Sequence, residues 1–138
     1  MLTTKDSLAG EPESRDAVLV LPSAEFPALA PEIVRQRLVV EGLVEHSIGR
    51  DEISSYLSGL SEVCDMRILQ EPVTHQSPLY GWAGWVHWEA SGAHFYAWDQ
   101  PRRFFSVDIY TCLAFDDAKV LDFTASFFNA TRTVARPF

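Results

Sequence analysis

The chain has 138 residues, of which 47% are hydrophobic and 22% charged, and this composition is typical of one soluble globular domain. Because 19 acidic residues outnumber 11 basic ones, the formal net charge of −8 argues against a nucleic-acid partner and an anionic membrane surface. The two cysteines, Cys64 and Cys112, form no CxxC pair, so both thiols are expected to be free, as in the cytoplasm. We expect neither a signal peptide nor a membrane-spanning segment.

Residues 1–16 are polar and acidic, and we expect them to form a mobile leader. The apolar run 17–21 is predicted to be a short strand, and the prolines after it argue against long regular structure. One helical turn is predicted for residues 32–36. These observations predict an N-terminal extension, residues 1–36, followed by a domain that spans residues 37–138.

The domain shows the apolar patterns of strands, which alternate, and of helices, which repeat every three to four residues. The first strand has Gly42 at an expected bend or bulge, and the second is weakened at Pro72. Asp51 is expected to cap the first helix, and Asp116 or Asp117 the second. The predicted strands are 37–45, 66–73, 81–89, 91–98, 103–112 and 131–135, and the predicted helices begin near residues 51 and 117.

This order, β-α-β-β-β-β-α-β, predicts an α+β fold, a two-layer sandwich of a mainly antiparallel sheet with two helices on one face. The other sheet face carries many aromatic side chains between Tyr80 and Cys112, and we expect a homodimer to cover it. The apolar stripes of the helices are predicted to be Ile53, Tyr56, Leu57, Leu60 and Val63 in the first, and Ala118, Leu121, Ala125 and Phe128 in the second.

Alternation along the predicted strands assigns the candidate catalytic residues to one or the other face of the sheet. Ser91 and His94 fall on opposite faces of strand 91–98, whereas Cys112 lies on the polar side of its strand, where structural cysteines are unusual. Cys64 follows the first helix stripe and is predicted to be a small buried residue. Three histidines, His75, His87 and His94, have no ligand spacing, so no metal site is expected.

A family resemblance rests on three motifs in order. The segment DIYTC (108–112) closes a strand that follows YGxxG (80–84) and a strand from Ser91 to Trp98. In this order the motifs resemble the small prokaryotic S-adenosylmethionine decarboxylases, which share the predicted order of elements. The resemblance runs from Arg37 to the C-terminus, and DIYTC is its most specific part.

The resemblance implies a pyruvoyl-dependent decarboxylase (a carboxy-lyase) of polyamine, in particular spermidine, biosynthesis. In the family a serine attacks the carbonyl before it, the chain is cleaved, and a pyruvoyl group remains that forms a Schiff base with S-adenosylmethionine. By position, autocatalytic cleavage falls between Ala90 and Ser91, with Ser91 as the pyruvoyl precursor and Cys112 as the proton donor. The residues that the resemblance places at the substrate are Trp98, Gln100, Glu41 and Tyr80.

The sequence departs from the family's pattern around the predicted cleavage site. The family cuts between Glu and Ser and continues with His, whereas this chain has Ala90 and Gly92 at the flanking positions. The helper serine of YGxSG is Ala83 and the helper histidine is Tyr96, so ester formation loses a donor and elimination loses its base. The acid that holds the ribose is replaced by Gln100, a neutral hydrogen-bonding group.

Other functions stay open beside S-adenosylmethionine decarboxylation. A relative could act on another amino acid, or the chain could stay uncleaved and bind S-adenosylmethionine or a related ligand, or serve as a partner subunit. A third hypothesis is an enzyme that uses Cys112, Asp108 and His87 without pyruvoyl. The fold alone does not separate them, because related folds carry different functions.

Overall fold

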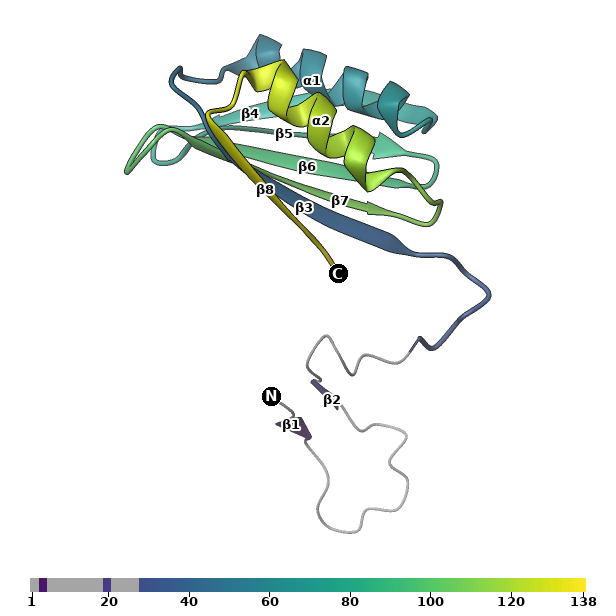
Figure 1. Cartoon of the computed structure of the whole chain (residues 1–138). Coiled ribbons are helices and arrows are strands. Elements are labelled where there is room, and N and C mark those ends of the chain that lie inside the picture. Colours follow the sequence, from purple (N-terminus) through teal and green to yellow (C-terminus); the bar gives the residue numbers. More distant parts are fainter. Residues whose placement is uncertain (1–2, 5–18, 21–27) are drawn as a thin grey trace. The chain divides into compact units, whose positions relative to one another are not determined.

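The computed structural model of the chain describes residues 3–4, 19–20 and 28–138 (Figure 1). By its internal contacts the chain divides into two units, Met1–Glu32 and Ile33–Phe138. The domain boundary expected after residue 36 stays a prediction.

The first unit contains two short strands, β1 (Thr3–Thr4) and β2 (Leu19–Val20), which pair antiparallel. The strand predicted for residues 17–21 is thus confirmed at its two described residues, and most of the expected leader lies outside the described residues. The helical turn predicted for residues 32–36 is wrong, because a non-helical turn leads directly into a strand that begins at Gln36. A helix of one turn has too few hydrogen bonds to offset its nucleation.

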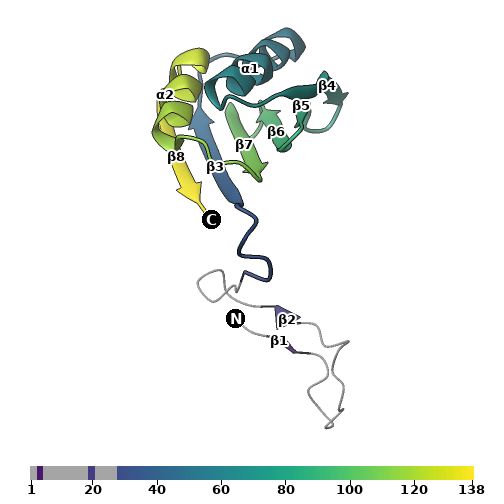
Figure 2. The ribbon, with the colours of Figure 1, turned by 90° about the vertical axis from the view of Figure 1, so that its right-hand side faces the viewer.

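The second unit is a six-stranded sheet with both helices on one face (Figures 1 and 2). The strand order is β4-β5-β6-β7-β3-β8, and each neighbouring pair is antiparallel. The predicted α+β sandwich and its order of elements are confirmed. The elements are β3 (Gln36–Leu43), α1 (Arg50–Val63), β4 (Ile68–Ser77), β5 (Gly81–Trp88), β6 (Ser91–Trp98), β7 (Phe104–Thr111), α2 (Asp117–Phe128) and β8 (Arg132–Pro137).

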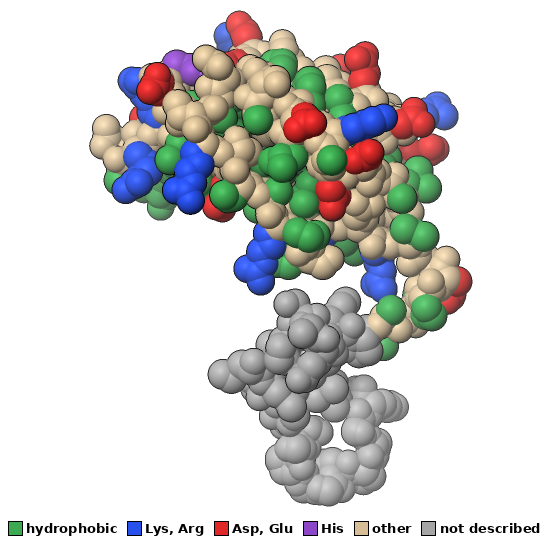
Figure 3. All heavy atoms as spheres, in the orientation of Figure 1, with side chains coloured by type: hydrophobic (Ala, Val, Ile, Leu, Met, Phe, Trp, Pro, Cys, Tyr) green, Lys and Arg blue, Asp and Glu red, His purple; other side chains and the backbone are tan. Residues whose placement is uncertain are grey.

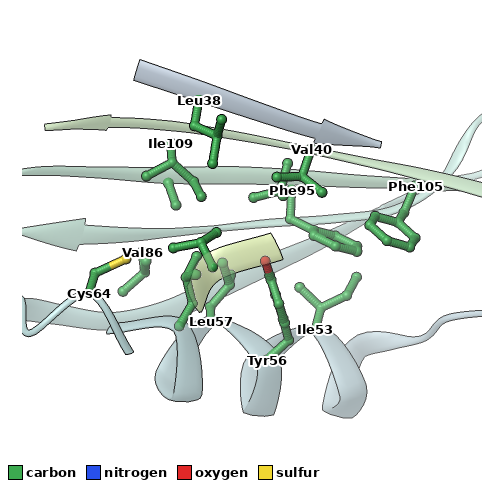
Figure 4. Packing of buried hydrophobic residues seen from close by; sticks show 14 of the residues in the cluster. Leu38, Val40, Ile53, Tyr56, Leu57, Cys64, Val86, Phe95, Phe105 and Ile109 are labelled. Carbon is green, nitrogen blue, oxygen red and sulfur yellow. The ribbon is translucent and has the colours of Figure 1, made fainter. Parts of the chain in front are cut away.

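The hydrophobic core fills the space between the helices and the sheet (Figure 4). Tyr56 of α1 is fully buried, and its ring centroid lies 4.8 Å from that of Phe128. The Tyr56 hydroxyl is hydrogen-bonded to the Thr124 hydroxyl at 2.7 Å, and the indole of Trp88 donates to the Ser61 hydroxyl at 2.7 Å. These buried hydrogen bonds hold α1 against α2 and β5. Separation of either pair would leave a buried polar group without a hydrogen-bond partner, which is energetically costly.

The helix starts differ from the prediction in one case. Asp116 caps α2 as expected, since its side chain accepts hydrogen bonds from the amides of Ala118 and Lys119. Asp51 does not cap α1, because the cap position is Gly49 and no side chain bonds there. Asp51 instead lies in the first turn, where a carboxylate interacts favourably with the positive end of the helix dipole.

The face of α2 that is buried against the core differs from the apolar face predicted for this helix. Ala118 is exposed, and the buried line consists of Val120, Thr124 and Phe128, at intervals of four. Hydrophobicity alone misses this line because Thr124 faces inward through its bond to Tyr56. In α1 the buried residues Ile53, Tyr56, Leu57 and Leu60 confirm the prediction, and Val63 is half-buried.

Two irregularities were predicted in the strands, and one of them is present. Gly42 does not mark a bulge, because β3 pairs in unbroken register with both neighbours. A Cβ at Gly42 would lie 2.5 Å from the Phe105 ring, so glycine makes room for that ring. In β4 the register does shift between Gln70 and Val73, around Pro72, which has no amide proton to donate.

The surface seen in Figure 3 carries acidic and basic side chains interspersed with hydrophobic ones. Among the described residues, no helix is long and apolar enough to cross a membrane.

Candidate active site

The sheet face away from the helices forms the floor of the candidate site. As the alternation predicted, Ala93 and Phe95 of β6 are buried under the helices, whereas His94 and Tyr96 are exposed on the open face. A shallow pocket of about 490 Å³, largely open to solvent, lies over β5, β6 and β7. It is lined by Trp85, Val86, His87, Ser91, Gly92, Ala93, His94, Asp108 and Tyr110.

The Ala90–Ser91 bond lies at the end of this pocket, where β5 turns into β6. Trp88 pairs with Ser91, so only two residues form the turn. The Ala90 carbonyl accepts a hydrogen bond of 3.0 Å from the backbone amide of Cys112, the residue after β7. The φ angle of Ser91 is 109°, a conformation that non-glycine residues adopt only under constraint from their surroundings.

Gly92 follows this strained serine, at the position where the resemblance places a histidine of the family. A Cβ at Gly92 would lie 2.3 Å from the carbonyl oxygen of Val86, on the neighbouring strand. The Val86 oxygen belongs to the backbone, and so a side chain at position 92 would meet no flexible side chain that could move aside. The hairpin in its present form therefore requires glycine at this position.

Asp108 forms the charged wall of the pocket. Its carboxylate accepts two hydrogen bonds from Arg37 of β3, from Nε at 3.0 Å and from a terminal nitrogen at 2.8 Å. This contact raises the pKa of Arg37, which partial burial alone would lower. The Phe138 ring lies over the Arg37 guanidinium, 4.6 Å from ring centroid to Cζ.

Three histidines of the sheet, His75, His87 and His94, lie on β4, β5 and β6. His87 pairs with Gly92, and His94 pairs with Asp108 on β7 and stacks on the Tyr96 ring at 5.2 Å. His75 lies on β4, away from this pocket. Within the described part of the chain, no three His, Cys, Asp or Glu side chains are arranged to hold a metal ion.

The two helper positions of the family are neighbours but lie away from Ser91. Ala83 and Tyr96 are direct partners across β5 and β6. Tyr96 stands five positions beyond Ser91 on one strand, which at about 3.3 Å per residue is roughly 17 Å. A helper group at either position could therefore not reach Ser91 within the same chain.

The predicted site residues fall into two groups. Ala90, Ser91 and Cys112 come together at one end of the sheet, as described above. Trp98 lies at the other end of β6, roughly 23 Å from Ser91 at the usual strand rise, where it packs on Phe104 at 5.3 Å. The structure thus does not bring Trp98 to the pocket that contains Ser91.

The remaining predicted substrate residues also lie outside the pocket. Gln100 is exposed in the connection after β6, and Tyr80 is 62% exposed in the turn before β5. Glu41 is half-buried in the middle of β3, opposite Ser106. None of the three lines the pocket over β5, β6 and β7.

The two cysteines have different environments. Cys64 is buried at the end of α1, and burial raises the pKa of its thiol to about 12, so this thiol stays protonated. Its prediction as a small buried residue is confirmed. Cys112 is exposed at the end of β7. Only Cys112 is thus accessible to a ligand or reagent.

Two features of the site were missed from the sequence. Arg37 is the partner of Asp108, although 71 residues separate the two in the chain. One arginine at the start of a strand gives no signal for such a pair, since strand order alone brings β3 beside β7. The steric demand for Gly92 depends equally on the hairpin geometry, which the sequence does not specify.

Comparison with solved structures identifies the class of fold. The crystal structure of adenosylmethionine decarboxylase from Aquifex aeolicus VF5 superposes with a TM-score of 0.61 and 20% sequence identity. The match covers 77% of this chain and 89% of that chain. At this identity the likeness shows a shared fold. A comparison with curated proteins finds no significant match.

The family follows from the sequence comparison. The family model described as S-adenosylmethionine decarboxylase matches residues 48–138, more than half of the chain. The chain therefore belongs to the S-adenosylmethionine decarboxylase family, which confirms the resemblance seen in its motifs. Ser91 and Cys112 lie within the matched segment, whereas Glu41 lies before it.

Proposed function

We propose that this protein is a pyruvoyl-dependent decarboxylase that acts on S-adenosylmethionine in polyamine (spermidine) metabolism in the cytoplasm. The observation that carries the proposal is the hydrogen bond from the Cys112 amide to the Ala90 carbonyl, beside the strained backbone of Ser91. A donor aimed at this oxygen stabilises the negative charge that develops when a hydroxyl attacks the carbonyl carbon. Strain at Ser91 raises the energy of the uncleaved chain and so favours the rearrangement.

The proposed cleavage is intramolecular up to its last step, which consumes one water. The Ser91 hydroxyl attacks the Ala90 carbonyl carbon, and the C–N bond breaks to leave an ester and a free amine. Transfer of the Ser91 Cα proton to water then breaks the ester bond and releases the segment that ends at Ala90 as a carboxylate. The remaining dehydroalanine takes up one water and loses ammonia, which leaves a pyruvoyl group at position 91.

The residues around Ser91 fit such a group. Ser91 borders the pocket, although its pairing with the buried residues Trp88 and Thr111 assigns its side chain to the helix side of the sheet. We propose that a ketone at position 91 is reached by a ligand from this pocket. When present, the pyruvoyl group supplies a ketone that condenses with the substrate amine and takes up the electrons released with CO2. Cys112 is exposed beside the Ala90–Ser91 bond, and we assign its thiol as the proton donor to the product carbon.

We also propose a homodimer formed through the open sheet face. Tyr96 is 41% exposed on that face outside the pocket, and Trp98 lies beside it. A partner that covers these rings removes apolar surface from water. Analytical ultracentrifugation measures the mass directly, and a monomer at micromolar concentration would exclude this dimer.

A second candidate is a family member that stays uncleaved and binds S-adenosylmethionine or acts as a partner subunit. The observations that favour it are Ala83 and Tyr96 at the helper positions and the steric exclusion of a side chain at Gly92. Intact-protein mass spectrometry separates the two. Cleavage gives two fragments, and the fragment that begins at position 91 has no free amino terminus. One full-length mass after long incubation would support the second candidate.

A further inference from the structure

The pocket beside Ser91 contains one fixed negative charge. Among the described residues that line it, Asp108 alone is acidic, and the rings of Trp85 and Tyr110 lie around the same space. A carboxylate beside aromatic rings can attract a cation, because a carboxylate and the face of an aromatic ring are both negative. The formal net charge of −8 acts in the same direction at longer range.

The Asp108 carboxylate is held in place by a chain of contacts that leads away from the pocket. Arg37 holds both carboxylate oxygens, at 3.0 and 2.8 Å, and does not itself line the pocket. A bidentate contact of this kind fixes the plane of the carboxylate as well as its position. The carboxylate therefore lies nearer to a ligand than the compensating guanidinium does.

Arg37 is in turn fixed by Phe138. The Phe138 amide donates to the Arg37 carbonyl at 3.1 Å, which sets the register of the two segments. The Phe138 ring covers the guanidinium at 4.6 Å and also lies 5.0 Å from the Cζ atom of Arg136. Stacking on an aromatic ring restricts the guanidinium to one plane and leaves its edge for Asp108.

We propose that Asp108 is the specificity-determining contact for the positively charged part of the ligand, and that Arg37 and Phe138 are positioning residues that hold its carboxylate. This inference rests on the proposed function, because it takes the pocket beside Ser91 as the substrate site. It adds that the pocket selects ligands by charge, and so distinguishes a sulfonium from a neutral thioether of the same shape.

The test uses the full chain with Ser91→Ala, which cannot cleave, and titration calorimetry with two ligands. S-adenosylmethionine carries the sulfonium charge, and S-adenosylhomocysteine has a neutral thioether instead. We expect the first to bind about fivefold to tenfold more tightly. Asp108→Asn should lower this ratio by roughly threefold or more, whereas Asp122→Asn, the same change on the exposed side of α2, should leave it unchanged.

Two charge-conserving variants isolate the positioning role. Arg37→Lys keeps the positive charge but loses the two-pronged contact, and Phe138→Leu removes the ring without changing any charge. Both should lower the affinity ratio, whereas Arg132→Lys, an exposed change on β8, should not. A ratio unchanged in Arg37→Lys and Phe138→Leu would overturn the positioning role.

The selectivity itself is overturned by equal affinity for the two ligands, by binding of neither, or by an unchanged ratio in Asp108→Asn. Thermal unfolding of each variant verifies that the domain is folded under the titration conditions. Cleavage is measured separately on the unmodified chain. An uncleaved chain with charge-selective binding overturns the pyruvoyl mechanism alone, and a cleaved chain without selectivity overturns this inference alone.

Discussion

The backbone amide of Cys112 donates a hydrogen bond of 3.0 Å to the carbonyl of Ala90. This bond joins the end of β7 to the turn between β5 and β6, so it depends on the sheet and not on a side chain. It points at the carbonyl that Ser91 would attack. One residue thus combines a backbone donor at the proposed cleavage bond with an exposed thiol side chain.

The two roles of Cys112 are separable by mutation. Cys112→Ala keeps the backbone amide, so we expect cleavage at Ser91 to proceed, while decarboxylation by the cleaved protein slows about 10²-fold to 10⁴-fold without its proton donor. Fragment masses and the rate of CO2 release measure the two steps. Cys64→Ala serves as the control and should keep full turnover. Blocked cleavage in Cys112→Ala, or unchanged turnover, would contradict these assignments.

Restoring the family's histidine at position 92 should fail. Because a Cβ there meets the Val86 carbonyl at 2.3 Å, Gly92→Ala and Gly92→His are expected to lower the free energy of unfolding by about 1–3 kcal/mol. Chemical denaturation measures this difference. Gly49→Ala is the matched control, because nothing lies within 4 Å of its added methyl group. A Gly92→His protein of full stability with faster cleavage would show that the hairpin adjusts.

The buried bond between Tyr56 and Thr124 should stabilise the contact between the helices. Tyr56→Phe removes the hydroxyl and leaves Thr124 without its partner, which is expected to cost about 1–3 kcal/mol. Thr124→Val should cost a similar amount. The double variant should then lose less than the sum of the two single changes. Additive losses in denaturation experiments would mean that the two hydroxyls do not interact.

Burial of Cys64 predicts a loss of stability in alkaline solution. The folded state raises the pKa of this thiol from 9.0 to about 12 because burial disfavours the thiolate. Because the pKa is higher in the folded state, the contribution of the buried, protonated Cys64 thiol to the free energy of unfolding is fully present below about pH 9. This contribution is lost as the pH rises towards 12. Cys64→Ala should flatten the decline of stability with pH in this range. The same slope in both proteins would contradict the assignment.

Much of the fold followed from local patterns. Alternation along Ser91–Trp98 assigned each side chain to its face, and the bounds of this one strand agree with the prediction to the residue. Two of the errors occurred where a contact between residues far apart in the sequence decided the outcome. Thr124 turns α2 toward Tyr56, and Phe105 fills the space that Gly42 leaves, and neither contact is visible in a local window.

The candidate site was predictable in part for the same reason. Ser91 and Cys112 were expected together from motif order, and strand pairing places them side by side. Trp98 was expected near the same ligand, but a strand of eight residues separates its two ends by more than a ligand pocket spans. The contact between Arg37 and Asp108 depends on the order of strands in the sheet, which local patterns do not determine.

The most direct test of the proposed chemistry is the intact mass of the purified full-length chain after prolonged incubation, compared with that of Ser91→Ala. We expect the unmodified chain to give two fragments, residues 1–90 and 91–138. Their combined mass should equal the mass of the chain plus one water minus one ammonia, while Ser91→Ala should remain whole. A single full-length mass for the unmodified chain would contradict the account of Ser91 as a pyruvoyl precursor.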